Sequence, residues 1–242
     1  MRQHLTDAGR LMVPRRRDPH GPLPPLLLAL TLLTGVIDAF SFLALGRVLV
    51  ANMTGNVIFS GFAVGGASGF LPWALFLAVA AFLAGAWLGG LMCRQLGAHR
   101  GRQLCAAVAV ELGLVGAAWI VCLMVSPPYR QWSLAALIVL LGVAMGVQNA
   151  TARAVAVPDL TTTVLTLTIT GIAADSMTAK GSKLGRRLVP VLTMFAGAAL
   201  GAALVSSGHD RAALALATGL LAVLVVPAVA AARSTEPWTR QV

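Results

Sequence analysis

Between Arg47 and Arg94 the chain carries no charged side chain. This run is too long for one membrane-spanning helix, which needs about 20 apolar residues, and the glycine-rich stretch 65–69 divides it into two apolar segments. The whole chain is 58% apolar and only 11% charged, with a mean hydropathy of +0.84. Soluble domains carry about 25% charged residues. The sequence therefore predicts an integral membrane protein.

The chain contains an internal repeat. Gly35 and Gly146 are 111 residues apart, and Gly85 and Gly197 are 112 apart, so that one inserted residue reconciles the two halves. Eight apolar segments can be drawn, and the first four match the last four. They cover about 24–45, 48–65, 70–93, 103–126, 132–156, 160–178, 188–207 and 212–232.

The repeat predicts one membrane domain with no soluble domain attached. The prolines at 127–128 separate its halves, because proline breaks a helix. The polar, basic start of the chain is expected to be a disordered cytoplasmic tail. The predicted organisation is a tail at 1–21, a membrane domain at 22–234 with repeats at about 24–126 and 132–232, and a second tail at 235–242.

The basic residues decide between two topologies. If all eight segments span, the connection with Arg94, Arg100 and Arg102 lies outside the cell, against the positive-inside rule. If segments 48–65 and 160–178 enter the bilayer without crossing it, that connection and both termini are cytoplasmic and the halves are inverted. We therefore expect an all-α integral membrane fold with six spanning helices plus two polar re-entrant or broken segments. Seven or eight spanning helices remain the alternative.

The net charge of +10 does not indicate nucleic-acid binding here, because the cations lie in the tails and connections. The first hydrophobic segment belongs to the repeat, so we expect it to be retained as a helix rather than cleaved as a signal peptide. The predicted location is the bacterial inner membrane.

Asp38 is the sharpest candidate for chemistry, since it lies midway along the first apolar segment. Ionisable residues at this depth often mark proton relays or binding sites. The alternative is a structural hydrogen bond to Thr34, Ser41 or Asn149. Because Asn149 occupies the matching position in the second half, the repeat does not provide a symmetric pair of acids.

Asn52, Thr54 and Asn56 make the second apolar segment unusually polar. Gly55 permits a break in a helix there, and a broken helix exposes backbone groups that can bind an ion or a polar solute. The alternative is that these side chains only connect helices. We expect them to meet Thr163 and Thr166, which lie in the matching segment of the second half.

Gln148, Asn149 and Arg153 complete the candidate substrate-binding or coupling site. Arg153 follows Asn149 by four residues and should share its helix face, where a cation could attract an anion. Glu111 is expected to form an ion pair with Arg102 at the cytoplasmic edge.

Small residues four apart recur in both halves and predict close helix packing rather than chemistry. The pairs are Gly61 with Gly65, Gly85 with Gly89, Gly142 with Gly146, and Gly197 with Gly201.

No sequence motif indicates a metal, a cofactor or an enzyme. The three cysteines, Cys93, Cys105 and Cys122, lack CxxC spacing, and the histidines show no HExxH pattern. Nucleotide-binding and hydrolase motifs are absent from the sequence. We expect neither a cofactor nor a catalytic function.

The stretches Thr34-Gly35-x-x-Asp38-Ala39-x-Ser41-Phe42-Leu43 and Val50-Ala51-Asn52-Met53-Thr54-Gly55-Asn56 resemble the YoaK-like family of bacterial membrane proteins. Gly146-x-Gln148-Asn149-Ala150-x-x-Arg153, followed by Thr162-Thr163-Val164-Leu165-Thr166, is similar to the second signature of that family. The resemblance covers about 24–232. It implies a multi-pass inner-membrane protein of unknown function and supplies no substrate.

Three functions compete. The repeat and its polar interruptions favour a channel or secondary transporter for a small polar solute or ion, with a site where the repeats meet. A membrane scaffold or assembly factor is the alternative, and an intramembrane enzyme is less favoured. The expected partners are the lipid bilayer and an unidentified solute, and homo-oligomers remain open.

Overall fold

The computed structural model describes residues 19–158, 160, 170 and 184–240. Within these residues the regular structure is helical, and the only β-type pairing is an isolated bridge between His99 and Arg240. The helices are α2 (Leu23–Ala44), α3 (Met53–Val64), α4 (Pro72–Gln95), α5 (Arg100–Met124), α6 (Gln131–Val155), α8 (Leu184–Ser206), α9 (Asp210–Arg233) and the short 3₁₀ helix η1 (Pro237–Thr239).

Six of these helices are long and apolar enough to cross a membrane: α2, α4, α5, α6, α8 and α9. Prolines open two of them, since proline fits the first turn of a helix, where an N–H has no partner within the helix. α3 is apolar but has only 12 residues, which at 1.5 Å per residue falls short of a bilayer core of about 30 Å. The predicted all-α fold with six long spans is confirmed.

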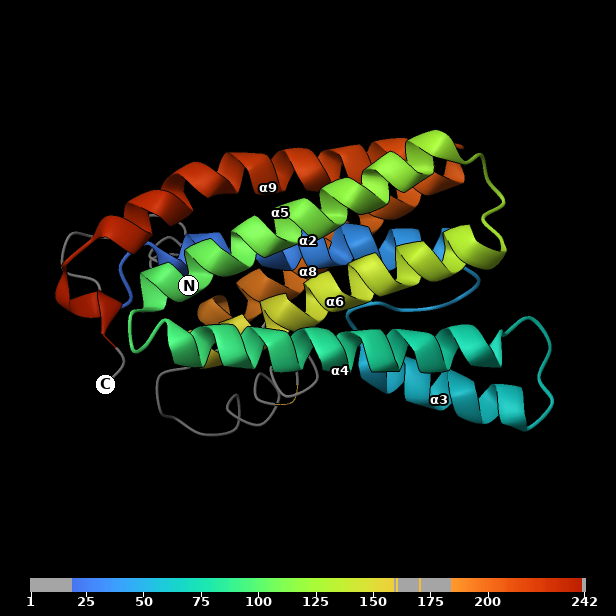
Figure 1. Ribbon diagram of the computed structural model, residues 1–242, viewed down its shortest axis with the longest axis horizontal. Coiled ribbons are helices and arrows are strands. Elements are labelled where there is room, and N and C mark those ends of the chain that lie inside the picture. The colour runs from blue at the N-terminus through green and yellow to red at the C-terminus, as the bar shows by residue number, and fades with distance from the viewer. Residues whose placement is uncertain (1–18, 159, 161–169, 171–183, 241–242) are drawn as a thin grey trace.

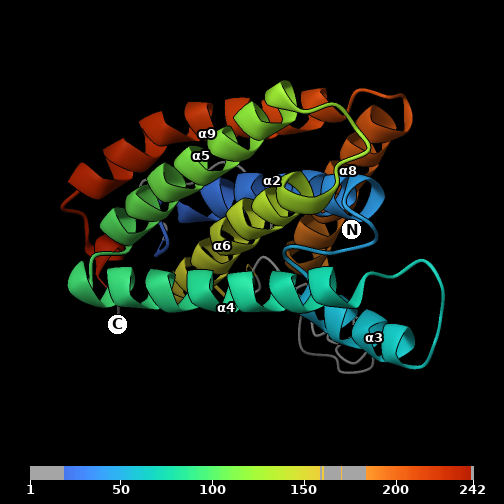
Figure 2. The ribbon, with the colours of Figure 1, turned by 45° about the vertical axis from the view of Figure 1, so that its right-hand side comes forward.

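The second apolar segment turns back within the bundle. After α2 ends, residues 45–52 run back along the neighbouring helices, and α3 then returns to the end at which α2 finished (Figures 1 and 2). The chain therefore enters and leaves this region on one side, as expected for a re-entrant segment. Its predicted counterpart at 160–178 lies outside the described residues, apart from positions 160 and 170.

The two halves run in opposite directions. Along the long axis of the molecule α2, α5 and α8 point one way, whereas α4, α6 and α9 point the other way (Figure 1). The first helix of the second half, α6, is thus antiparallel to its counterpart α2. This arrangement confirms the expected inverted repeat.

The third helix of each half, α4 or α8, packs against the first helix of the other half. α4 packs against α6, and α8 packs against α2. A Cβ atom added at Gly146 would overlap the carbonyl oxygen of Phe82, and one added at Gly35 would overlap that of Met194. Phe82 and Met194 are 112 residues apart, as are the glycines Gly85 and Gly197. The predicted close packing is confirmed for the pairs Gly85 with Gly89, Gly142 with Gly146, and Gly197 with Gly201. It is wrong for Gly61 with Gly65: an added Cβ at Gly61 meets nothing within 4 Å, and one at Gly65 meets only its own helix.

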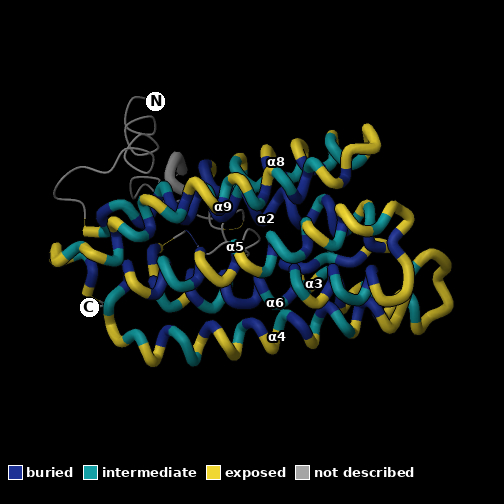
Figure 3. The backbone as a smooth tube through the Cα atoms, turned by 45° about the horizontal axis from the view of Figure 1, so that its top comes forward, coloured by how far each residue is buried: buried dark blue, intermediate teal, exposed yellow. Residues whose placement is uncertain are grey.

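α2 and α6 form the centre of the bundle and bury most of their residues (Figure 3). The outer helices expose large apolar side chains, including Trp87 on α4, Phe195 on α8 and Val226 on α9. Such faces are stable in contact with lipid, whereas the buried polar groups of α2 and α6 are enclosed by protein.

Candidate functional site

Asp38 is held on the buried side of α2, where its carboxylate reaches the re-entrant segment. One oxygen, Oδ1, accepts hydrogen bonds from the backbone N–H groups of Val50, at 3.0 Å, and Ala51, at 2.9 Å. The hydroxyl of Ser41 donates to the backbone carbonyl of Asp38 and not to its carboxylate. Among the described residues the carboxylate is therefore bound by backbone groups, not by the side chains that the sequence suggested.

Asn56 binds the same segment from α3. Its Oδ1 accepts a hydrogen bond from the N–H of Leu49 at 2.9 Å, and its Nδ2 donates to the carbonyl oxygen of Leu49. The side chain is completely buried. Within a membrane protein each backbone N–H and C=O needs a partner. Asp38 and Asn56 supply partners for three successive peptide units in a stretch that has no helix of its own.

The neighbouring polar residues Asn52 and Thr54 do not share the buried position of Asn56. Asn52 precedes the first turn of α3 and makes no side-chain capping bond, and both Asn52 and Thr54 are exposed. Only Asn56 of the three points into the protein. Thr163 and Thr166, which were expected to face them, lie outside the described residues.

A second polar contact joins the central helices of the two halves. Gln148 on α6 donates from Nε2 to the hydroxyl oxygen of Thr34 on α2 at 2.7 Å, and the Thr34 hydroxyl donates to the carbonyl oxygen of Leu30. The carbonyl oxygen of Gln148, Oε1, is buried and has no hydrogen-bond partner among the described residues. An unsatisfied buried acceptor costs about 1–3 kcal/mol, so this oxygen is a place where a donor from a solute would be stabilised.

The other predicted residues of α6 point elsewhere. Asn149 is half-buried and donates to the carbonyl oxygen of Met145 on its own helix. Arg153 is exposed at the end of α6. The structure therefore brings Thr34, Asp38 and Gln148 into the centre of the bundle, but not Arg153.

Glu111 differs most from its sequence prediction. The expected ion pair with Arg102 is wrong: Glu111 is completely buried in the middle of α5, and Arg102 is exposed. Both carboxylate oxygens of Glu111 lack a hydrogen-bond partner among the described residues. The rotation of α5 about its axis directs Glu111 inward, and no sequence pattern marked it as buried.

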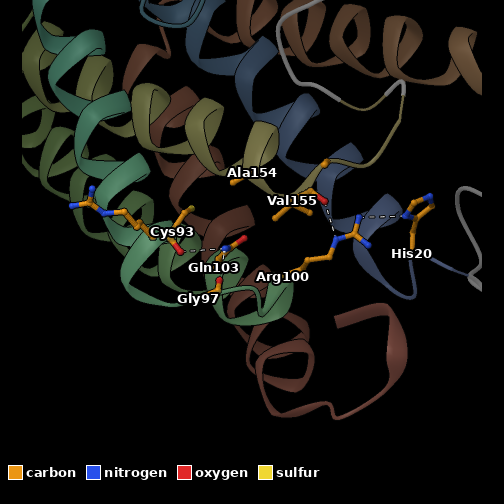
Figure 4. Close-up of a pocket in the computed structure, with 9 residues that line it drawn as sticks. His20, Cys93, Gly97, Arg100, Gln103, Ala154 and Val155 are labelled. Carbon is orange, nitrogen blue, oxygen red and sulfur yellow. Dashed lines mark hydrogen bonds between the residues drawn. The ribbon is translucent and has the colours of Figure 1, made fainter. Parts of the chain in front are cut away.

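Arg100 organises one end of the bundle and was read in the sequence only as a topology marker. Its guanidinium is buried and donates from Nε to the carbonyl oxygen of Val155, the last residue of α6, at 2.8 Å (Figure 4). An arginine at a helix C-terminus satisfies carbonyl groups that have no partner within the helix. Nη2 lies 3.3 Å from Nδ1 of His20. The bond from Arg100 to Val155 thus joins the first residue of α5 to the last residue of α6.

A pocket of about 590 Å³ opens beside Arg100 (Figure 4). None of the residues that line it is acidic. The lining residues are His20, Cys93, Arg94, Gly97, Arg100, Gln103, Ala154, Val155 and Ala156. Gln103 donates to the carbonyl oxygens of Gly97, at 2.7 Å, and Cys93, at 3.2 Å, which holds the α4–α5 connection against the pocket.

The family comparison covers both halves of the molecule. The family described as "Protein of unknown function (DUF1275)" matches residues 26–226. The chain belongs to this family. It is also 30% identical over 151 residues to the UPF0700 transmembrane protein YoaK of Bacillus subtilis (strain 168), which confirms the resemblance seen in the motifs. That alignment covers 62% of this chain and 65% of the relative, so it spans less than two thirds of the relative's length. No solved structure matches.

The residues matched to the DUF1275 family include Asp38, Asn56, Arg100 and Gln148, whereas the end of α9 and the C-terminal tail follow them. The central polar contacts thus belong to the part of the chain that the family shares. In the described part of the chain, no group of three His, Cys, Asp or Glu side chains could hold a metal ion.

Proposed function

We propose that this member of the DUF1275 family is a channel or secondary transporter for a small polar solute or ion, with its route where the two repeats meet. The observation that carries the proposal is the re-entrant segment, whose irregular backbone at 49–51 is held by Asp38 and Asn56. Irregular backbone at membrane depth is tolerated where protein encloses it or where it lines a cavity. Transporters with inverted repeats build their sites from such interrupted segments near the midplane.

The proposed contacts for the solute are the polar groups at the crossing of α2 and α6. Gln148 offers a carbonyl oxygen that has no hydrogen-bond partner among the described residues, and Thr34 is its hydrogen-bonded neighbour. Asp38 lies one helical turn beyond Thr34, so the three groups form a short polar path between the halves. A solute with hydrogen-bond donors would satisfy the oxygen of Gln148.

Asp38 is the proposed coupling group. A carboxylate accepts hydrogen bonds about twice as strongly as a neutral acceptor. Protonation of Asp38 would therefore weaken the two bonds that hold Val50 and Ala51, and would release the re-entrant segment. This mechanism connects the proton occupancy of one side chain to the position of a whole segment.

The proposed orientation places both termini in the cytoplasm and the protein in the inner membrane. Among the arginines that the structure describes, more lie at one end of the bundle than at the other, and the positive-inside rule assigns that end to the cytoplasm. Those at this end are Arg94, Arg100, Arg102, Arg153, Arg187, Arg233 and Arg240, against Arg47, Arg130 and Arg211 at the other end.

Flux measurements in proteoliposomes test the proposal. Wild-type protein is expected to move a solute above the rate of empty vesicles, with a rate that responds to a pH gradient. Asp38→Asn should remove the pH response while the protein still inserts. Asp210→Asn is the matched control, because Asp210 is also buried but binds Tyr129 at the end of the bundle. Absence of flux for every ion and metabolite tested would favour the scaffold function instead.

A further inference from the structure

The C-terminal tail folds back onto the start of α5 and is fixed there by three contacts. Arg240 forms the isolated backbone bridge with His99, and Nε2 of His99 lies 3.1 Å from the carbonyl oxygen of Ser234. Arg100 donates from Nη1 to the carbonyl oxygen of Trp238 at 3.3 Å. The tail therefore has a defined path across the end of the bundle.

This path brings three arginines from distant parts of the sequence to one groove of about 790 Å³. Arg102 comes from the first turn of α5, Arg233 ends α9, and Arg240 lies in the tail; all three are exposed. None has an acidic partner among the described residues, and no lining residue is acidic. Like charges that share a groove repel each other, so an anion that binds between them is stabilised.

From this groove we infer a binding site for the phosphate headgroup of an anionic phospholipid. Arginine is suited to the task, because its planar guanidinium donates two parallel hydrogen bonds to a phosphate. Ser234, Thr235 and Thr239 line the same groove, and the exposed Thr235 adds a hydroxyl group, whereas the buried Thr239 hydroxyl donates to the carbonyl oxygen of Glu236.

The position of the groove favours a lipid over a free phosphate. It lies at the ends of α5 and α9, two helices that are apolar enough to span a membrane, and hence at the level of the headgroups. Leu96, Ala98 and Ala232 line it beside the arginines and offer apolar contact to the first part of a lipid. Basic pockets between spanning helices are known to bind anionic headgroups.

The groove is separate from the pocket beside Arg100. In that pocket the buried guanidinium already donates to protein carbonyl groups, whereas the guanidinium groups of the three arginines in the groove have no such acceptor among the residues that the structure describes. The groove also needs residues that follow the family-matched range 26–226. Lipid binding at this place does not depend on whether the protein transports a solute.

Thermal unfolding of the purified full chain in detergent tests the site. We expect added phosphatidylglycerol to raise the unfolding midpoint more than phosphatidylcholine does, since a ligand bound to the native state stabilises it. The double variant Arg102→Gln/Arg240→Gln should weaken the apparent affinity for phosphatidylglycerol about 30-fold, from the effect of two basic residues near an anionic headgroup. The control Arg130→Gln/Arg211→Gln removes two exposed arginines at the opposite end and should keep wild-type affinity.

Three results would overturn the inference. They are equal stabilisation by the two lipids, unchanged selectivity in the double variant, and full competition by inorganic phosphate, which would assign the groove to a soluble anion. If the double variant does not fold, Arg240→Gln alone is examined by native mass spectrometry. Loss of co-purified phosphatidylglycerol supports the lipid site, and retention of wild-type occupancy contradicts it.

Discussion

Removal of the Asp38 carboxylate should open the re-entrant segment without unfolding the bundle. In Asp38→Ala the N–H groups of Val50 and Ala51 lose their acceptor in a buried place. Each buried donor left without a partner costs about 1–3 kcal/mol, which predicts a loss of about 2–6 kcal/mol. Since segment 45–52 has no helix of its own, this loss is expected to appear as local opening.

Asp38→Asn should have about half of that effect. The amide keeps an oxygen at the position of Oδ1, but it loses the negative charge, and charge-assisted hydrogen bonds are roughly twice as strong as neutral ones. Comparison of the free-energy losses in Asp38→Ala and Asp38→Asn thus shows how much of the stabilisation of residues 50 and 51 needs an acceptor oxygen and how much needs its negative charge.

Hydrogen exchange measured by mass spectrometry in nanodiscs provides the assay. A local loss of about 3 kcal/mol should speed exchange at 49–51 on the order of 100-fold, while amides of α6 keep their protection. Ser41→Ala is the matched control, because the Ser41 hydroxyl contacts the backbone carbonyl of Asp38 and not the carboxylate. It should leave exchange at 49–51 close to wild type.

A double-mutant cycle with Asn56→Ala sharpens the test. Asn56 holds Leu49 in the same short segment, so once one variant has released the segment, the other should cost less than it does alone. Unchanged exchange at 49–51 in Asp38→Ala, or an equal rise throughout all helices, would refute the reasoning.

Three further variants probe the bundle. Gly146→Ala should lower the unfolding free energy by about 1–3 kcal/mol through overpacking, whereas Gly90→Ala, where an added Cβ meets nothing within 4 Å, should be neutral or slightly stabilising in an SDS titration. Glu111→Leu should raise the unfolding free energy by about 1–3 kcal/mol, since it removes two buried oxygens that have no partner within the described part of the chain; a stabilised variant with reduced flux would assign Glu111 to transport. Tyr129→Phe should cost about 1 kcal/mol, because the phenol, whose pKa burial raises, donates to Asp210 at 2.8 Å.

Much of the fold could be predicted because it follows from coarse properties of the chain. The placement of Arg94, Arg100 and Arg102 favoured six crossings over eight under the positive-inside rule, and the described residues form six long apolar helices with a re-entrant segment. The glycine spacing predicted close packing, and the structure adds which helices pack together: α4 on α6 and α8 on α2.

The polar site was less predictable, because hydrogen-bond partners depend on helix rotation and on the path of irregular backbone. Asp38 binds residues 50 and 51, which reach it only because the chain turns back after α2. Asn52, Thr54 and Asn56 were expected to face the second half together, but α3 begins at Met53, so Asn52 lies before the helix, and only Asn56 is buried. Glu111 was misassigned for the related reason that its spacing from Arg102 does not reveal which way α5 is turned.

The two halves of the molecule share their glycine packing but differ in their buried polar contacts. Gly35 and Gly146 make the same backbone contacts at the same offset, because the close approach of two helices leaves room for no other residue in either half. Asp38 and Asn149 occupy matching positions too, yet Asp38 holds a separate segment, whereas Asn149 donates to the carbonyl oxygen of Met145 on its own helix. Of these two matching positions, only the one in the first half carries a carboxylate. If protonation drives the movement of the re-entrant segment, it acts in the first half, so Asp38→Asn should alter the pH response of transport more than Asn149→Ala does.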